Sequence, residues 1–229
     1  MHSRQTWSRR HSATLWVAAY LYGSLPLVYW LGRRAHVDLR RAGSGNVGAT
    51  NLLQYGGSTG KALAAAAWLF DASKGAAPPA LARALGAPPQ VAALAGVCGA
   101  AGQCWPVTLR FRGGRGISAF VGAAALMDPL AWSLSLLPMA LGSGWRVASA
   151  HRSSRSRSVP LGCFIAAAIF PPLCAWRRVE AGWLAPLALS TVILARRLTA
   201  AQPDDAKVGP RQQRRALLYR LLYDRNTSA

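Results

Sequence analysis

A glycine-rich polar segment interrupts the apolar sequence at residues 43–51, which read GSGNVGATN. Glycine tolerates positive φ angles and lets a backbone approach a ligand closely. Exposed amides, hydroxyls and carboxamides in such a loop can hold a phosphate group. The segment lacks the Gly-Lys-Ser/Thr ending of a P-loop, and no predicted strand precedes it, so neither common nucleotide-binding fingerprint fits. Taken alone, the segment is equally well explained as an ordinary turn.

A second polar segment, DASKG at residues 71–75, ends an apolar stretch. Asp71 and Lys74 are three residues apart, so on a helix they share a face and can form an ion pair. Because ionisable groups at membrane depth are costly, such groups usually have a function or a partner. A purely structural ion pair at the membrane interface is the alternative interpretation.

The third segment, RFRGGRG at residues 110–116, combines arginines with glycines. Arginine binds phosphate oxygens in bidentate geometry, and neighbouring glycines let the backbone take part. Basic residues also flank membrane spans. Two glycines directly before Arg115 exceed what flanking requires, so this turn is a candidate anion site.

The elements that must position these segments are apolar helices. Hydrophobic residues make up 52% of the 229 residues and charged residues only 15%, against roughly 25% charged in a soluble domain. We predict an all-α, polytopic integral membrane protein with about five to seven transmembrane or half-spanning helices. The candidate spans are 13–32, 76–101, 117–141, 160–176 and 183–195, with shorter pieces at 61–70 and 76–85. Gly86, Pro88 and Pro89 leave open that the second candidate is two short helices.

The spacing of the first two segments predicts that they lie on the same membrane side. Only about ten continuously apolar residues separate Asn51 from Asp71, which is half of what a span needs. The connection is therefore expected to be a short, tilted or re-entrant helix packed in protein.

The formal net charge is +20, from 27 Lys and Arg against 7 Asp and Glu. The basic residues lie between the apolar blocks, as in membrane proteins, and do not alternate with aromatic stacking platforms, so we expect no nucleic-acid partner. The basic loop after the first span predicts a cytoplasmic location for that loop. Arginines in the N-terminal extension argue for the opposite orientation.

We divide the chain into a basic N-terminal extension (1–12), a membrane domain (13–200) and a basic C-terminal tail (201–229). Within the tail, leucines at helical spacing alternate with arginines at 214, 215, 220 and 225. This pattern predicts a basic amphipathic helix on anionic lipid. A solvated tail helix is the alternative.

Taken in order, SGNVGATN, D-x-x-K-G and GGRG resemble the integral-membrane, acyl-phosphate-dependent glycerol-3-phosphate acyltransferases of bacteria, and residues 23–26 (GSLP) resemble the family's first-span signature. The resemblance implies transfer of a fatty acyl group from acyl phosphate to the 1-position of glycerol 3-phosphate, giving lysophosphatidic acid in phospholipid synthesis. It implies no cofactor and no metal. It also implies a multi-pass protein of the bacterial plasma membrane with a cytoplasmic site. Membrane lipids and the enzyme that makes acyl phosphate are the further expected partners.

The resemblance also implies the site. The catalytic residues are expected to be Ser44, Asp71, Lys74 and Arg115. The substrate-binding residues are expected to be Gly45, Asn46, Gly48, Thr50, Asn51, Gly113, Gly114 and Gly116. The proton acceptor is expected to be either Asp71 or a phosphate oxygen of the substrate.

Several positions depart from the family pattern. Gln54 replaces an arginine, Gln103 a histidine and Arg115 a lysine. The C-terminal His-Arg-x-Asn-Ile-x-Arg-Leu element is represented only by remnants at 194–199 or 214–223, which lack the histidine and the asparagine. These departures keep a second hypothesis open, namely a catalytically degenerate homologue that acts as a membrane lipid-binding or scaffold protein. A transporter is least favoured because the sequence shows no convincing internal repeat.

Overall fold

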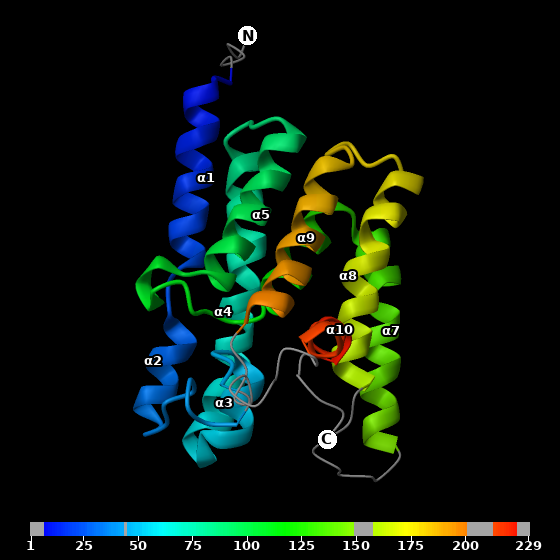
Figure 1. Ribbon diagram of the computed structural model, residues 1–229. Coiled ribbons are helices and arrows are strands. Elements are labelled where there is room, and N and C mark those ends of the chain that lie inside the picture. The colour runs from blue at the N-terminus through cyan, green and yellow to red at the C-terminus, as the bar shows by residue number, and fades with distance from the viewer. Residues whose placement is uncertain (1–6, 44, 149–157, 201–212, 224–229) are drawn as a thin grey trace.

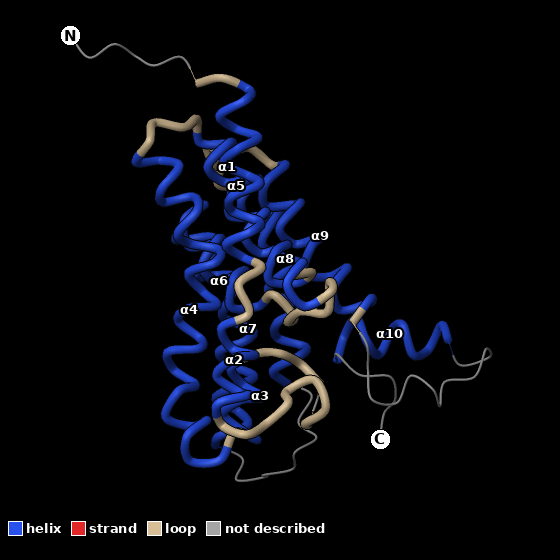
Figure 2. Tube along the Cα trace, turned by 90° about the vertical axis from the view of Figure 1, so that its left-hand side faces the viewer, coloured by secondary structure: helices blue, strands red, loops and turns tan. Residues whose placement is uncertain are grey.

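The computed structural model describes residues 7–43, 45–148, 158–200 and 213–223. Within them, every regular element is a helix (Figures 1 and 2). The elements are α1 (Arg9–Gly23), α2 (Leu27–Arg34), α3 (Ala49–Tyr55), α4 (Gly57–Ala84), α5 (Pro89–Cys104), the 3-10 turn η1 (Val107–Leu109), α6 (Ile117–Met127), α7 (Pro129–Ala148), α8 (Ser158–Trp176), α9 (Leu184–Thr199) and α10 (Gln213–Tyr223). The all-α prediction is confirmed.

By length and hydropathy, three helical stretches of the described chain can cross a membrane, namely Arg9–Arg34, Pro89–Leu109 and Val159–Trp176. The apolar stretches Ile117–Met127 and Pro129–Leu141 are shorter. The longest helix, α4, has 28 residues, which corresponds to about 42 Å. It carries Asp71 and Lys74 on its buried face.

Helices α4, α5 and α6 pack unusually closely because glycine and alanine line their interfaces. A Cβ atom on Gly75 of α4 would overlap the Ala119 carbonyl of α6, and one on Gly122 would overlap the Ala72 carbonyl. Small residues of this kind let membrane helices approach to backbone contact, where dispersion and weak hydrogen bonds hold them together. This packing fixes the depth of Asp71 and Lys74 against α6.

The second half of the chain packs α7 against α8 and α9 against α5 and α8. Phe120 of α6 and Phe170 of α8 meet edge to face with ring centroids 5.5 Å apart, and both are fully or almost fully buried. A continuous apolar core therefore joins the two halves behind the glycine-rich turns.

The candidate span at 76–101 is divided within residues 84–90, as the alternative of two helices predicted. Helix α4 continues to Ala84, and the chain reverses before α5 begins at Pro89. Gly86 has a φ of +78°, which favours glycine, and Pro89 suits the first turn of the next helix. The expected short helix between the first two polar segments is likewise part of α4 and not a separate element.

The predicted span at 117–141 is also interrupted. Asp128 adopts an extended conformation between α6 and α7, and its Oδ1 accepts a hydrogen bond of 2.7 Å from the Ala131 amide. This cap starts α7 as a new helix. In the first candidate span the helix breaks at residues 24–26, where Pro26 precedes α2. The candidate span at 160–176 is confirmed as α8. The candidate at 183–195 corresponds to α9, a helix of 16 residues that is not among the three stretches able to cross a membrane.

The helices define two ends of the molecule (Figure 1). One end carries the start of α1, the α4–α5 turn, the α6–α7 break and the α8–α9 turn. Helices α2 and α3, the start of α4 and helix α10 lie toward the other end. The glycine-rich turns lie where α1, α5 and α9 finish. We therefore call the end that carries α2, α3, the start of α4 and α10 the site end.

Candidate active site

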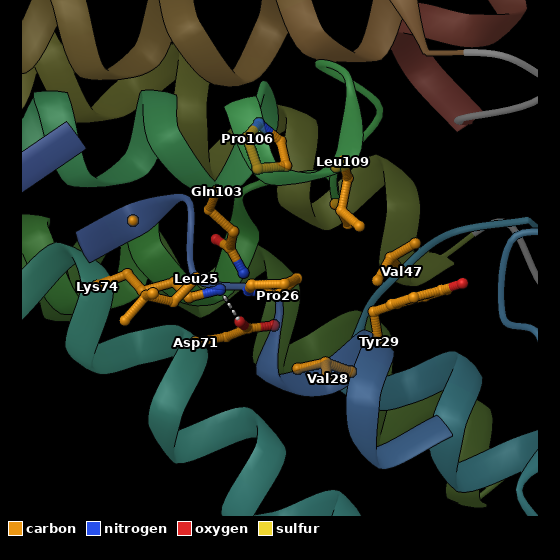
Figure 3. Close-up of a pocket in the computed structure, with 13 residues that line it drawn as sticks. Leu25, Pro26, Val28, Tyr29, Val47, Asp71, Lys74, Gln103, Pro106 and Leu109 are labelled. Atoms are coloured by element: carbon orange, nitrogen blue, oxygen red, sulfur yellow. Dashed lines mark hydrogen bonds and ion pairs between the residues drawn. The ribbon is translucent and has the colours of Figure 1, made fainter. Parts of the chain in front are cut away.

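The predicted ion pair between Asp71 and Lys74 is present and deeply buried. The Lys74 Nζ lies 2.8 Å from Asp71 Oδ1, and the two residues are only 4% and 2% exposed. The Gln103 side chain of α5 points toward Asp71 (Figure 3), and Lys74 Nζ lies 5.2 Å from the centre of the Phe70 ring. A buried charge pair needs such additional partners to be tolerated.

This pair forms the polar side of a narrow cleft that is partly open to solvent. Figure 3 shows Lys74, Asp71 and Gln103 pointing toward one another. The rest of the lining is largely apolar apart from the Tyr29 hydroxyl, and it comes from the α1–α2 break, α2, the first polar segment and η1. Its residues are Leu25, Pro26, Val28, Tyr29, Val47 and Leu109.

The third polar segment closes the cleft with Gly113 and Gly114. The Gly114 amide donates to the Gln103 carbonyl at 3.1 Å, and a Cβ on Gly113 would overlap the same carbonyl. Gly116 has a φ of +77° and caps α6. Arg115, between these glycines, is 8% exposed and is not among the residues that line the cleft, so its predicted contact with substrate stays a prediction. The turn therefore needs glycine for both close approach and backbone conformation.

The first polar segment reaches the same turn. A Cβ on Gly114 would lie 3.0 Å from the Val47 carbonyl and 3.8 Å from Asn46 Oδ1. The 43–51 segment and the Gly113–Gly116 turn thus contact each other. Both border the cleft that is also lined by Asp71 and Lys74 of the second segment. Gly45 has a φ of +67°, and Gly48 caps α3. Ser44 lies outside the described residues.

Asn51 and Thr50 differ from the other residues of this segment. Asn51 is 4% exposed, and its Nδ2 donates to the carbonyls of Leu39, Ala42 and Asn46 at 3.0–3.1 Å. It therefore stabilises the loop, and a direct substrate contact for it stays a prediction. Thr50 is exposed in the first turn of α3, and its predicted substrate contact also stays untested.

A network on the loop before this segment supports the cleft wall. Arg40 donates to both carboxylate oxygens of Asp38 at 2.9–3.0 Å and to the Tyr29 hydroxyl at 2.8 Å. The hydrogen bonds from Arg40 lower the pKa of Asp38 to about 2. The ionised pair thereby ties the loop to α2, whose Tyr29 lines the cleft.

Arg196 of α9 was not among the predicted site residues. It is 6% exposed, and its guanidinium donates from Nε to the Gly114 carbonyl at 2.9 Å and from Nη2 to the Gly113 carbonyl at 2.8 Å. The buried Cys104 thiol lies within electrostatic reach of Arg196, Arg115, Lys74 and Asp71. In the sequence, Arg196 reads only as part of a C-terminal remnant at the end of an apolar span.

These features define a class: a helical membrane protein with a buried lysine–aspartate pair in a cleft beside glycine-packed helices and glycine-rich turns. The chain belongs to the glycerol-3-phosphate acyltransferase family, whose model matches residues 13–201.

Relatives with this description are similar over much of the chain. The Rubrobacter xylanophilus protein is 42% identical over 58% of this chain, and the match spans 63% of that protein. A Dehalococcoides mccartyi relative is 45% identical, but only 48% of its length is matched. The Pseudomonas entomophila protein is 37% identical over 79% of this chain and 88% of its own length. The chain thus spans less than two thirds of the first two relatives and most of the third.

Solved structures of one member share the fold. The glycerol 3-phosphate form of PlsY (YgiH), an integral membrane glycerol 3-phosphate acyltransferase, superposes with a TM-score of 0.67 at 25% identity. The match covers 81% of this chain and 87% of that one. The lysophosphatidic acid form gives a TM-score of 0.65 at 22% identity. The prediction of family and fold class is confirmed.

Proposed function

We propose that this chain transfers a fatty acyl group from acyl phosphate to the 1-hydroxyl of glycerol 3-phosphate, giving lysophosphatidic acid. The observation that carries the proposal is the buried Lys74–Asp71 pair, which faces a glycine turn and a predicted phosphate loop across one cleft. Family membership and the glycerol 3-phosphate bound by a solved relative support the same substrate.

The charges of the site suit a phosphorylated ligand. Asp71 balances Lys74, so the two further buried cations, Arg115 and Arg196, leave a net positive charge around the cleft. In a low-dielectric setting such cations attract phosphate strongly. We assign Lys74 and Arg115 to the phosphate charges. Backbone and side-chain donors of the first segment complete the binding of phosphate, with Ser44, Gly45, Asn46 and Gly48 as the proposed contacts.

The proposed reaction needs little beyond positioning. The oxygen of the substrate hydroxyl attacks the acyl carbonyl carbon, a new ester C–O bond forms, and the mixed-anhydride C–O bond to phosphate breaks. Inorganic phosphate leaves. Holding the two substrates together can lower the barrier by about 7–11 kcal/mol in the best cases, and cations at the developing charge add further stabilisation.

The hydroxyl proton most plainly goes to a phosphate oxygen of the substrate. Asp71 already accepts a 2.8 Å bond from Lys74, so a proton taken up by Asp71 would cost the buried ion pair its partner charge. Among the described residues, the cleft lining contains no histidine. In acyl phosphate, the phosphate is attached to the carbonyl carbon that the hydroxyl attacks, so a phosphate oxygen is close to the hydroxyl proton. The proton transfer therefore needs no additional side chain.

We further propose that the site end faces the cytoplasm of a bacterial cell, with the protein in the plasma membrane. The described residues at the site end include many cations, namely Arg33, Arg34, Arg40, Arg41, Lys61, Arg110, Arg112, Arg196, Arg197, Arg214, Arg215 and Arg220. The opposite end carries Arg9, Arg10, Arg83, Arg177 and Arg178. This asymmetry follows the positive-inside rule.

The test is acyl transfer by the purified protein in lipid vesicles supplied with acyl phosphate and labelled glycerol 3-phosphate. We expect labelled lysophosphatidic acid and inorganic phosphate in a one-to-one ratio. Lys74→Met should reduce the rate by about 10²–10³-fold, as loss of one transition-state donor does. Ala77→Leu on the exposed face of the same helix is the matched control. A wild-type protein that binds glycerol 3-phosphate without transfer would instead support the degenerate lipid-binding homologue.

A further inference from the structure

We propose that Arg196 is a positioning residue that holds the Gly113–Gly114 turn in its anion-binding conformation, an inference that rests on the proposed function. Its guanidinium binds the two successive carbonyls of the turn at 2.8 and 2.9 Å. Arg196 itself is not among the residues that line the cleft. Its two bonds to Gly113 and Gly114 go to the turn that borders the cleft, so its effect on the substrate is exerted through that turn.

The direction of the two carbonyls is what matters for an anion. A carbonyl oxygen carries partial negative charge and repels phosphate, whereas an amide N–H attracts it. Gly113 and Gly114 border the cleft, yet both of their carbonyl oxygens are drawn to Arg196 on α9. Because a trans peptide points its N–H opposite to its C=O, this interaction also fixes the direction of the Arg115 amide. The turn is thereby made compatible with a phosphate group.

Glycine makes this restraint necessary. Residues without a Cβ move among many backbone conformations, so a Gly-Gly pair beside an open cleft needs an external partner to remain in one of them. On the other side, the Gly114 amide bonds the Gln103 carbonyl. The turn is therefore held from α5 and from α9 at once.

Arginine suits this role better than lysine. The planar guanidinium offers several donors in a fixed fork, and here Nε and Nη2 reach different carbonyls. A lysine ammonium keeps the charge but lacks the rigid fork. Arg196→Lys therefore separates the geometry of the restraint from the positive charge near the cleft.

The neighbouring Arg197 provides a matched control. It is 3% exposed, and it also donates to backbone carbonyls, but its partners are Leu221 of α10 at 2.6 Å and Pro160 of α8 at 2.7 Å. It does not contact the turn through any bond that the structure describes. Arg197→Lys therefore reproduces the helix-end disturbance without loosening the glycines.

The experiment measures kcat and KM for both phosphate substrates with wild type, Arg196→Lys and Arg197→Lys in vesicles. For Arg196→Lys we expect KM for glycerol 3-phosphate or acyl phosphate to rise about tenfold or more, with a smaller change in kcat. Arg197→Lys should keep KM near the wild-type value. Equal KM shifts in the two variants, or a wild-type KM in Arg196→Lys, would overturn the inference.

Two further measurements keep the result interpretable. In Arg196→Ala, added guanidinium ion should restore part of the lost activity, whereas Lys74→Met should not respond to it. Binding of glycerol 3-phosphate, followed by calorimetry, tests the turn independently of turnover. If wild type binds glycerol 3-phosphate but makes no product, the proposed acyl transfer fails, and unchanged affinity in Arg196→Lys would then reject the role of Arg196 as well.

Discussion

At the scale of residues, the proposed site depends on Lys74 and Asp71, which are almost completely buried. Both are at most 4% exposed in a region packed by glycine, alanine and phenylalanine. Removing one member of such a pair strands a charge, which costs about 3–5 kcal/mol. A single variant can therefore lose activity either because the protein is destabilised or because the reaction has lost a catalytic group. These two causes must be measured separately.

A double substitution separates them. Lys74→Met alone should lower both stability and acyl transfer, because Asp71 is then unpaired. Asp71→Asn combined with Lys74→Met removes both charges, so we expect the thermal unfolding temperature to recover toward that of wild type while acyl transfer stays about 10²-fold or more below it. Unfolding of the purified protein in detergent and the vesicle assay measure the two effects. Restored transfer in the double variant would show that Lys74 serves packing alone.

Arg115 offers a charge-conserving comparison. The family pattern has lysine at this position, and the side chain here is 8% exposed beside the glycine turn. We expect Arg115→Gln to lose transfer by about 10²-fold or more, whereas Arg115→Lys keeps most of the rate because the cation remains. Rates measured at saturating substrate decide this. A higher rate in Arg115→Lys would show that arginine is a compromise, and an active Arg115→Gln would remove Arg115 from the site.

At the scale of elements, the site depends on how closely α4 approaches α6. Gly75 lies one residue beyond Lys74, and there is no room for a Cβ beside the Ala119 carbonyl. The D-x-x-K-G motif thus combines a charged pair with the glycine that lets its helix pack. The glycine of this motif has a structural role that the sequence alone did not reveal.

Gly75→Ala should force α4 and α6 apart. Overpacking of this kind costs about 1–3 kcal/mol, which lowers Tm by about 5 °C in a protein of this size, and transfer should fall with it. Ala77→Leu, two residues further along on the exposed face of α4, adds more volume without a clash and should change neither quantity. Equal stability of Gly75→Ala and wild type would contradict the close approach.

Helix α10 carries the other element-scale prediction. It packs on α8 and α9, while Leu217, Leu218, Arg214 and Arg215 remain exposed. This combination fits the predicted interfacial helix. Arg214→Gln with Arg215→Gln should weaken the dependence of activity on anionic lipid, measured by varying the anionic fraction of the vesicles, because each basic residue near such a surface contributes about 1 kcal/mol. An unchanged dependence would favour the solvated tail helix.

Helix boundaries were the least predictable feature of these elements. The interruptions at Gly86, at Asp128 and before Pro26 are one to four residues long, so a span-sized window averages them into the surrounding apolar sequence. The composition correctly gave the helix class, because backbone groups in a membrane must bond within their own segment. The end of each helix is decided by single turn and cap residues. Hydropathy averaged over a span-sized window is insensitive to such single residues.

At the scale of the whole molecule, the sequence predicted that the three polar segments meet at one site. It did not predict the Arg196 side chain that holds the glycine turn in place. Three polar segments in an apolar chain indicated one phosphate site, and the structure brings Val47, Lys74 and Gly114 to one cleft. Arg196 escaped prediction because a cation at the end of an apolar helix resembles ordinary flanking charge. Only the folded arrangement reveals that its bonds cross more than 80 residues of sequence to the turn.

The same scale gives a topology prediction. Lys61 at the start of α4 and Glu180 between α8 and α9 are both exposed and lie toward opposite ends. In intact cells, a membrane-impermeant maleimide should label Glu180→Cys and should reach Lys61→Cys only after permeabilisation. The wild-type protein is the control, since its four cysteines are buried or half-buried. The reverse labelling pattern would place the site outside.

An experimental structure of the protein with glycerol 3-phosphate bound would show where the phosphate lies. We predict that it lies in the cleft, within hydrogen-bonding distance of Lys74 and of groups from both the 43–51 segment and the Gly113–Gly116 turn. A phosphate bound instead in the arginine-lined cavity at the opposite end, between Arg83 and Arg178, or bound by one segment alone, would contradict it.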